Sequence, residues 1–79
     1  MSYVQVPTEL WTTSLMPEGI LERWLVEDGS TVAAGQALAC IRINDSLHEV
    51  MSPASGRITA MVPTNSVVDP GATIAELAG

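Results

Sequence analysis

The sequence predicts an all-β fold, a small sandwich or barrel, and three observations support this. Six glycines and five prolines interrupt the 79 residues, and the runs between them are short and rich in Val, Ile, Leu and Thr. The chain also repeats a strand–turn–strand pattern. One such unit cannot bury its apolar face alone, whereas two copies can pack face to face around a pseudo-twofold axis. We therefore expect a single domain over residues 1–79.

The expected elements are short strands separated by turns. Residues 20–26 nearly alternate, with Trp24 and Val26 on one side and Arg23 and Leu25 on the other. Their β-branched and aromatic residues favour a strand, although periodicity alone also allows a helix over 20–28. Gly29 follows this strand and is free to adopt a positive φ. In full, we expect strands near residues 4–6, 20–26, 37–43, 48–51, 56–61 and 73–77.

A hairpin tip is expected between the third and fourth of these strands. Asn44, Asp45 and Ser46 lie there, and Asn and Asp tolerate the left-handed backbone region that tight turns use. As a turn residue, Asp45 needs no further role. A carboxylate at an exposed tip is also suited to a basic site on a partner protein.

The internal repeat consists of two ordered sets of matching residues. Gly19 matches Gly56 at an offset of 37, whereas Gly35 matches Gly71 at an offset of 36, so the second copy lacks one residue. We place this loss in the turn around Asn65. The segments before Gly35 and Gly71 are expected to be extended loops that end in a tight turn. The further matches pair Val32 with Val68, Leu38 with Ile74, Ala39 with Ala75 and Ile41 with Leu77.

The acidic charge limits the classes of partner. Nine Asp and Glu residues against three arginines give a net charge of −6, which repels nucleic acid and anionic membrane surfaces. A solvated surface is the ordinary interpretation, and a negative face that meets a basic partner is the alternative. Cys40 lies in an apolar run and is expected to be a buried, inert thiol in a reducing compartment. No leader-like start and no apolar run near the ~20 residues that span a bilayer are visible, so we expect a cytoplasmic monomer.

The sequence contains no pattern typical of a catalytic or metal site. It has no phosphate-binding loop, nucleophile–base pair or paired metal-ligand spacing, so we expect neither an enzyme nor a metal site. His48, the only histidine, is expected to face solvent on the strand after the turn. Grouping it with Asp45 and Glu49 as metal ligands is an alternative. Trp24 is expected in the core, whereas Trp11 lies in a loop-like stretch and is the better candidate for exposure.

Two stretches of the chain carry the motifs of a known domain family. The first contains Glu18-Gly19, Trp24-Leu25, Asp28-Gly29, Val32, Gly35 and Leu38, and the second contains Val50, Ser52-Pro53, Gly56 and Ile58. With this order and spacing, the chain from about Val4 onward resembles the biotinyl/lipoyl carrier domains. The resemblance implies a flattened β-barrel of two four-stranded antiparallel sheets related by a twofold axis, the barrel-sandwich hybrid. It also implies a hairpin tip at which a ligase joins lipoate or biotin to a lysine.

This chain departs from the family at the attachment position. The family's lysine lies eight residues before the proline of the Ala/Ser-Pro-x-x-Gly segment, which is Pro53 here, and that position is Asp45. The tips of the family read Asp-Lys-Ala or Met-Lys-Met, whereas this tip reads Asn44-Asp45-Ser46. The 79 residues contain no lysine, and a carboxylate cannot form the amide. The resemblance therefore implies a degenerate tip that carries neither lipoate nor biotin, and it leaves lipoyl or biotinyl ancestry open.

The expected function is that of a non-enzymatic protein-interaction module in an acyl-transfer or carboxylase-type assembly. Its partner is then an acyltransferase, decarboxylase or carboxylase subunit. The alternative is a carrier subunit, so classed by resemblance, of a 2-oxo-acid dehydrogenase or of a biotin-dependent carboxylase or decarboxylase. In relatives, the loop after the first strand lies beside the tip and contributes to partner recognition. We therefore hypothesise that Trp11, Asp45 and His48 form one partner-binding surface.

Overall fold

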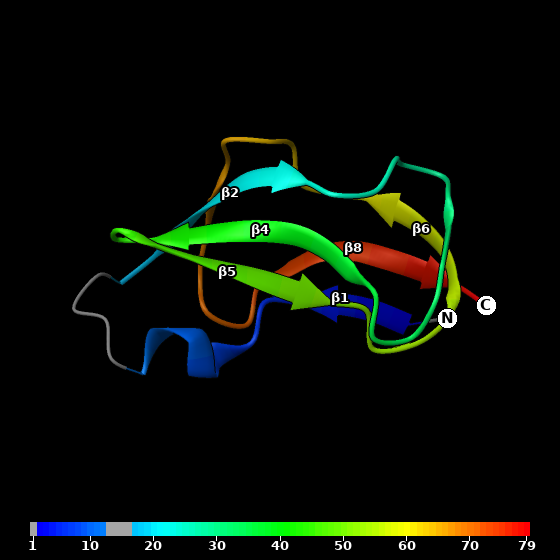
Figure 1. Ribbon diagram of the computed structural model, residues 1–79, viewed down its shortest axis with the longest axis horizontal. Helices are drawn as coiled ribbons and strands as arrows, with labels where there is room; N and C mark the ends of the chain where they lie inside the picture. Colours follow the sequence, from blue (N-terminus) through cyan, green and yellow to red (C-terminus); the bar gives the residue numbers. More distant parts are fainter. Residues whose placement is uncertain (1, 13–16) are drawn as a thin grey trace.

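Two four-stranded antiparallel sheets form a flattened sandwich in the computed structural model, which describes residues 2–12 and 17–79 (Figure 1). The strand orders are β1-β8-β6-β3 and β5-β4-β2-β7. This confirms the expected all-β fold of two four-stranded sheets. The elements of the described residues are β1 (Ser2–Gln5), the 3₁₀ helix η1 (Thr8–Trp11), β2 (Gly19–Trp24), β3 (Thr31–Val32), β4 (Ala37–Ile43), β5 (Ser46–Met51), β6 (Gly56–Ala60), β7 (Val67–Val68) and β8 (Thr73–Ala78).

The two halves of the chain complete each other's sheets. Strands β2, β3 and β4 correspond to β6, β7 and β8, and the short strands are exchanged, since β3 pairs with β6 and β7 pairs with β2. Equivalent hydrogen bonds accompany this exchange. The Gly29 N–H donates to the Ile58 carbonyl (2.8 Å), and the Asn65 N–H donates to the Leu21 carbonyl (2.7 Å). Neither half is therefore a closed unit by itself, as the repeat predicts.

Matching turns of the two halves use the left-handed backbone region. Gly29 has a φ of 87° and its counterpart Asn65 a φ of 71°, while Gly35 and Gly71 have φ values of 84° and 81°. Asn is one of the few residues other than Gly that adopt this region at low cost. The expected positive φ at Gly29 is therefore confirmed, and it recurs at the equivalent turn.

The extra residue of the first repeat lies in β2, so our placement of the offset in the following turn is wrong. Leu21 pairs with Ile41 and Arg23 pairs with Cys40, which leaves Glu22 without a pairing partner on β4. Such an extra residue is a β-bulge. The equivalent pairing of β6 with β8 shows no shift. The offset between the repeats consequently changes at Glu22.

Because of the bulge, the strict alternation of side chains expected along β2 is wrong. Leu21 is buried in the core, and Trp24 and Val26 pack against the same core, while Arg23 is exposed. A strict alternation places Leu21 with Arg23 and opposite Trp24. Because the extra residue shifts the alternation of side chains by one position, Leu21 and Trp24 lie on the same side of the sheet.

Short elements account for most of the other differences from expectation. The two-residue strands β3 and β7 replace the expected extended loops, and η1 replaces a loop-like stretch. The helical alternative over residues 20–28 is excluded, because Gly19–Trp24 is strand β2. Strand β5 begins at Ser46, two residues earlier than expected. Two-residue strands have no detectable periodicity, and these two form only because the other half of the chain supplies their partner.

The core lies between the two sheets and is aliphatic. Leu38 in β4 and Ile74 in β8 are fully buried. Each lies at an irregularity in strand pairing, Leu38 where β4 pairs with β5 and Ile74 where β8 pairs with β1. Burying one such side chain contributes about 1.5–3 kcal/mol to stability. Cys40 is also buried, as expected. The largest fully buried side chains are Leu21, Leu38, Ile41, Ile43, Ile58, Ile74, Leu77, Val4, Val6 and Val50.

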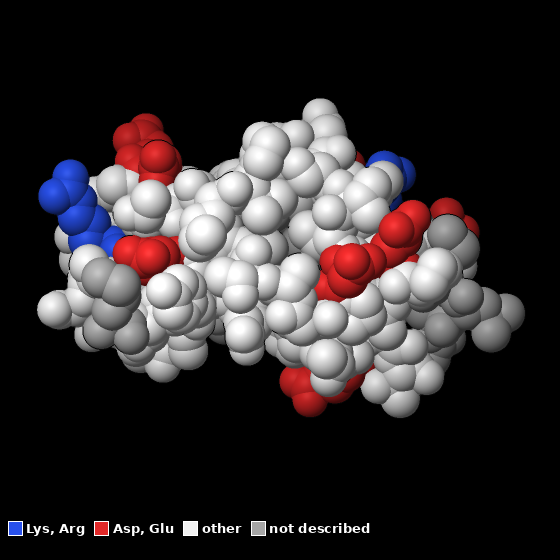
Figure 2. Space-filling view, turned by 180° about the vertical axis from the view of Figure 1, so that it is seen from behind, with Lys and Arg blue, Asp and Glu red and all other residues white. Residues whose placement is uncertain are grey.

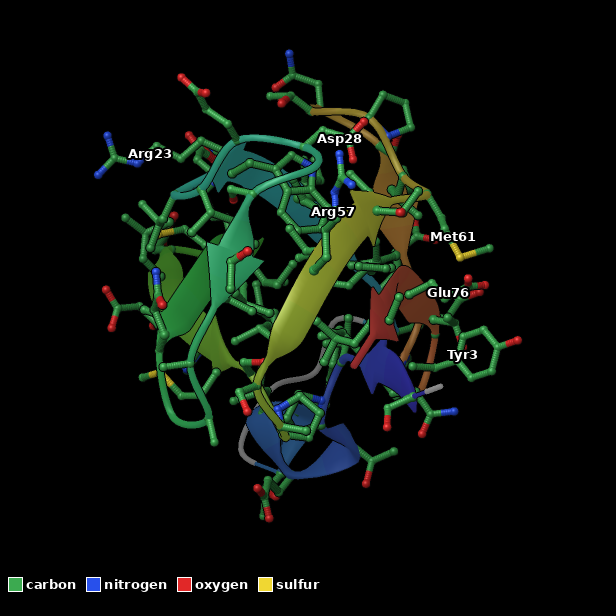
Figure 3. All side chains as sticks on the ribbon, turned by 90° about the vertical axis from the view of Figure 1, so that its right-hand side faces the viewer. Tyr3, Arg23, Asp28, Arg57, Met61 and Glu76 are labelled. Atoms are coloured by element: carbon green, nitrogen blue, oxygen red, sulfur yellow. The ribbon has the colours of Figure 1, made fainter. Side chains whose placement is uncertain are left out.

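The turn of the β4–β5 hairpin lies at one end of the long axis of the sandwich, and the chain ends lie toward the other (Figure 1). At the end where N and C lie, the Arg57 Nε–H donates to the Gly29 carbonyl (2.9 Å) and the Ala60 N–H donates to Asp28 Oδ1 (2.8 Å). Figure 3 shows Arg57 and Asp28 close together there, with Arg23 projecting away from the sandwich. Two of the three arginines thus lie away from the hairpin turn. Among the described residues, no helical segment has the length and hydropathy that crossing a bilayer requires.

Candidate functional site

The β4–β5 hairpin places Asn44 and Asp45 at its turn. Ile43 pairs with Ser46, so two residues connect the strands. Asn44 has a φ of 58°, which its short polar side chain tolerates. Ile43 is 2% exposed and anchors the end of β4 in the core. The expected hairpin turn is therefore present, with Ser46 as the first residue of β5 and not as part of the turn.

The exposed groups at this turn are oxygens and an amide. Asn44, Asp45, Ser46 and the following Leu47 are all exposed. The Asp45 carboxylate is an acceptor of hydrogen bonds and pairs well with a guanidinium or an ammonium group. None of these side chains carries a basic amine. The turn is chemically suited to meet a cationic group, and it offers no nitrogen nucleophile.

A shallow hollow with a volume of about 310 Å³ lies beside the turn. Its lining combines the turn with the start of β2, the end of β4 and the short strand β7. Arg42 in this lining donates from Nε to Glu22 Oε2 at 2.9 Å. The two side chains are 49% and 39% exposed, so the pair contributes about 0–1 kcal/mol to stability. The residues that line the hollow are Glu18, Gly19, Ile20, Arg42, Asn44 and Val67.

The surface around the sandwich is predominantly acidic. Figure 2 shows acidic side chains distributed over the back face, while the arginine side chains visible there lie near its two ends. Within residues 2–12 and 17–79, the Arg42–Glu22 pair is the one ion pair present. Most acidic side chains of the described residues therefore take no part in an ion pair.

Trp11 is buried, so the expectation that it is exposed is wrong. It ends η1 and is 9% exposed within the hydrophobic core, with Leu10 packed against that core. Burial of an indole ring removes a large apolar area from water, which explains why the segment before residue 13 folds inward. Among the described residues, no group accepts a hydrogen bond from its Nε1.

His48 is half-buried, which corrects the expectation that it faces solvent. It pairs with Ile41 and lies two residues from Val50, both of which are buried. Since side chains alternate along a strand, His48 lies on the inward side of β5 and Glu49 on the outward side. Of the three residues hypothesised to form a partner surface, Asp45 alone is exposed. In the described part of the chain, no three His, Cys, Asp or Glu side chains are grouped so that they could hold a metal ion.

Trp24 joins the two halves of the molecule. It packs against the core, as expected, and its Nε1–H donates to the Val62 carbonyl at 2.9 Å. Sequence reasoning did not find the hollow, because Glu18, Arg42 and Val67 are far apart in the chain. No local pattern marks them, and only the pairing of β2 with both β4 and β7 brings them together.

Comparison with known proteins agrees with this architecture. A family model described as "Biotin-requiring enzyme", the biotin/lipoyl domain, matches residues 12–77. The comparison with curated proteins found no match. The matched region contains the repeat, both sheets except β1, and the β4–β5 turn. Domains of this family are carriers that are not catalytic themselves and interact with enzymes of carboxylase and dehydrogenase systems. The chain therefore belongs to the biotin/lipoyl family of carrier domains.

Proposed function

We propose that this carrier-type domain is neither lipoylated nor biotinylated and acts as a protein-interaction module of an acyl-transfer or carboxylase-type assembly. One observation carries the proposal: Asp45 occupies the exposed turn between β4 and β5, and the 79 residues contain no lysine. The fold and its turn are retained without the amine that attachment needs.

The chemistry of attachment explains why the turn does not fit either group. Lipoate and biotin are joined to the family's domains through an amide, which requires a primary amine as the nucleophile. Asp45 has a carboxylate, and the nitrogen of Asn44 belongs to an amide, whose lone pair is delocalised. Neither can replace a lysine amine. No transfer step is therefore assigned to this domain.

The retained turn supports a binding role. Pairing of Ile43 with Ser46 holds the two turn residues on a six-pair ladder, and the carboxylate of Asp45 is exposed at its end. A charge on a rigid, exposed turn loses little conformational freedom when it binds. The partner surface that it fits is basic, because a carboxylate pairs best with Arg or Lys.

Intact-mass measurement tests the proposal. The chain is co-expressed separately with a lipoate–protein ligase and a biotin–protein ligase, and its mass is expected to equal that of the unmodified polypeptide. The Asp45→Lys variant is expected to gain the mass of one lipoyl or biotinyl group, because it restores an amine at the turn. Glu49→Lys is the matched control: position 49 is exposed on β5 but lies outside the turn, so this variant is expected to stay unmodified.

Two outcomes would contradict the proposal. A mass increase of the original chain shows that attachment does not need a lysine at position 45. A folded Asp45→Lys variant that remains unmodified by both ligases shows that this turn is not equivalent to the family's attachment tip. Circular dichroism of both lysine variants separates this second result from a loss of the fold.

A further inference from the structure

A row of side chains crosses the outer face of the sheet that carries the turn. Val67 pairs with Ile20, Ile20 with Arg42, and Arg42 with Leu47, so each of the four strands contributes one residue. Residues paired across strands share one face of a sheet. Val67 and Leu47 are 58% and 62% exposed. An aliphatic surface that contains one arginine therefore faces solvent here.

The equivalent strands of the other sheet do not carry such an aliphatic row. The equivalent positions of the other sheet are occupied by Thr31, Arg57 and Ala78, which pair with one another in the same order. They present a hydroxyl, a guanidinium and a methyl group where Val67, Ile20 and Arg42 present two branched aliphatic chains and a guanidinium. The aliphatic row is thus a property of the sheet that ends in the β4–β5 turn.

The electrostatics of the hollow favour a cation. The guanidinium of Arg42 is paired with Glu22, the bulged residue of β2, at 2.9 Å. Glu18 is exposed in the lining, and Asp45 follows the lining residue Asn44. Because Glu22 neutralises the charge of Arg42, the carboxylates of Glu18 and Asp45 determine the local charge. Together with the net charge of −6, they disfavour an anion and attract a positive group.

The size and the lining of the hollow restrict the kind of cation. Its volume of about 310 Å³ is at the lower end of the ~300–1,000 Å³ typical of sites for whole small molecules. The described residues offer no group of three His, Cys, Asp or Glu side chains for a metal ion. The paired residues Ile20 and Val67 give the lining aliphatic side chains, and Glu18 gives it a carboxylate. Lysine and arginine side chains combine an aliphatic stem with a cationic head, which matches this pairing of surfaces.

We propose that this hollow binds a lysine or arginine side chain from a basic segment of a partner protein. The aliphatic stem lies against Ile20 and Val67, and the cationic head pairs with Glu18. This inference specifies which side chains of the partner protein bind to the domain. It rests on the proposed function of the domain as a protein-interaction module. It also gives the bulge at Glu22 a role, since Glu22 neutralises the arginine that would otherwise repel the incoming cation.

Titration followed by ¹H–¹⁵N correlation spectra tests this binding on the whole 79-residue chain. The probes are three capped tripeptides, Gly-Lys-Gly, Gly-Arg-Gly and Gly-norleucine-Gly, the last with an aliphatic chain and no charge. A basic peptide is expected to shift the amides of Gly19, Ile20, Arg42, Asn44 and Val67, and added salt to weaken the effect. The norleucine peptide is expected to bind more weakly. Whichever basic peptide binds more tightly identifies the preferred side chain.

Two variants test whether the carboxylate of Glu18 binds the basic side chain. Glu18→Gln is expected to weaken binding of the basic peptide by about two- to fivefold, the range of an exposed ion pair. Glu27→Gln removes the same charge from an exposed position outside the lining and is expected to leave binding unchanged.

Several results would overturn the proposal. They are the absence of shifts with both basic peptides, shifts spread over the surface without a maximum at the hollow, equal binding of the norleucine peptide, or equal losses in the two variants. The test is independent of the mass experiment. Lipoylation of the original chain would contradict the proposed function. It would not change the peptide titration, which measures by itself whether the hollow prefers a basic side chain.

Discussion

Deletion of Glu22 tests the bulge as the place where the two repeats differ. Between Ile20 and Trp24, Glu22 is the one residue of β2 without a partner on β4, and the equivalent strand β6 runs from Ile58 to Thr59 without an extra residue. Removing Glu22 lets Arg23 follow Leu21 as Thr59 follows Ile58. The register on both sides of the deletion then matches the pairing that the second half already uses. We therefore expect the shortened chain to fold.

The expected cost follows from what Glu22 contacts. Its side chain is 39% exposed and makes an ion pair with Arg42, an interaction that contributes about 0.2–1 kcal/mol at such exposure. The deletion removes no core side chain, so we expect the free energy of unfolding to fall by about 1 kcal/mol. For a domain of this size, the corresponding fall in Tm is about 4–8 °C. The Glu22→Gln variant measures the ion-pair part separately.

Deletion of Thr59 is the matched control, because it removes an exposed residue from the equivalent strand, which has no bulge. A one-residue slip there turns inward side chains outward. Exposing Ile58 alone costs about 1.5–3 kcal/mol, in addition to the disturbed pairing with β8. Thermal unfolding followed by circular dichroism is expected to show a fall in Tm at least about twice that of the Glu22 deletion. Equal falls for the two deletions would refute the assignment of the extra residue to the bulge.

Two further substitutions examine the contacts that position the turn and join the halves. Trp24→Phe is expected to lower the free energy of unfolding by about 1 kcal/mol in urea denaturation, because the hydrogen bond from Nε1 to the Val62 carbonyl is lost; an unchanged midpoint would contradict that bond. Asn44→Ala is expected to cost about 1 kcal/mol because of the positive φ at this position, whereas Asn44→Gly is expected to cost less. The same denaturation experiment compares them, and an equal loss in both variants would argue against a left-handed residue in the turn.

The hairpin turn and the repeat were predictable because they depend on short-range chemistry. Gly29 and Asn44 adopt the left-handed region that their residue types allow. The matching residues of the two halves also imply equivalent strands, and these are present in equivalent orders. The prediction of β4 as residues 37–43 agrees with the structure, because a short, mainly apolar run between turn residues has the length of a buried strand and is too short for an ordinary helix.

The environments of individual side chains were less predictable. Trp11 and His48 lie in short, weakly patterned segments, and their burial depends on which other strands pass over them. An isolated aromatic residue in a loop-like stretch is compatible with either exposure or burial. The same applies to the bulge: the sequence shows that the offset changes by one residue, but pairing with β4 decides that the change occurs at Glu22.

The sequence by itself determined the all-β class, the twofold repeat, the position of the turn and the lack of a lysine amine, since each follows from residue types or from spacing within short segments. Only the tertiary structure decided the exchange of β3 and β7, the burial of Trp11 and the hollow beside the turn. Each of these depends on contacts between segments tens of residues apart. Such contacts form when the two halves pack, and no local preference of the backbone encodes them.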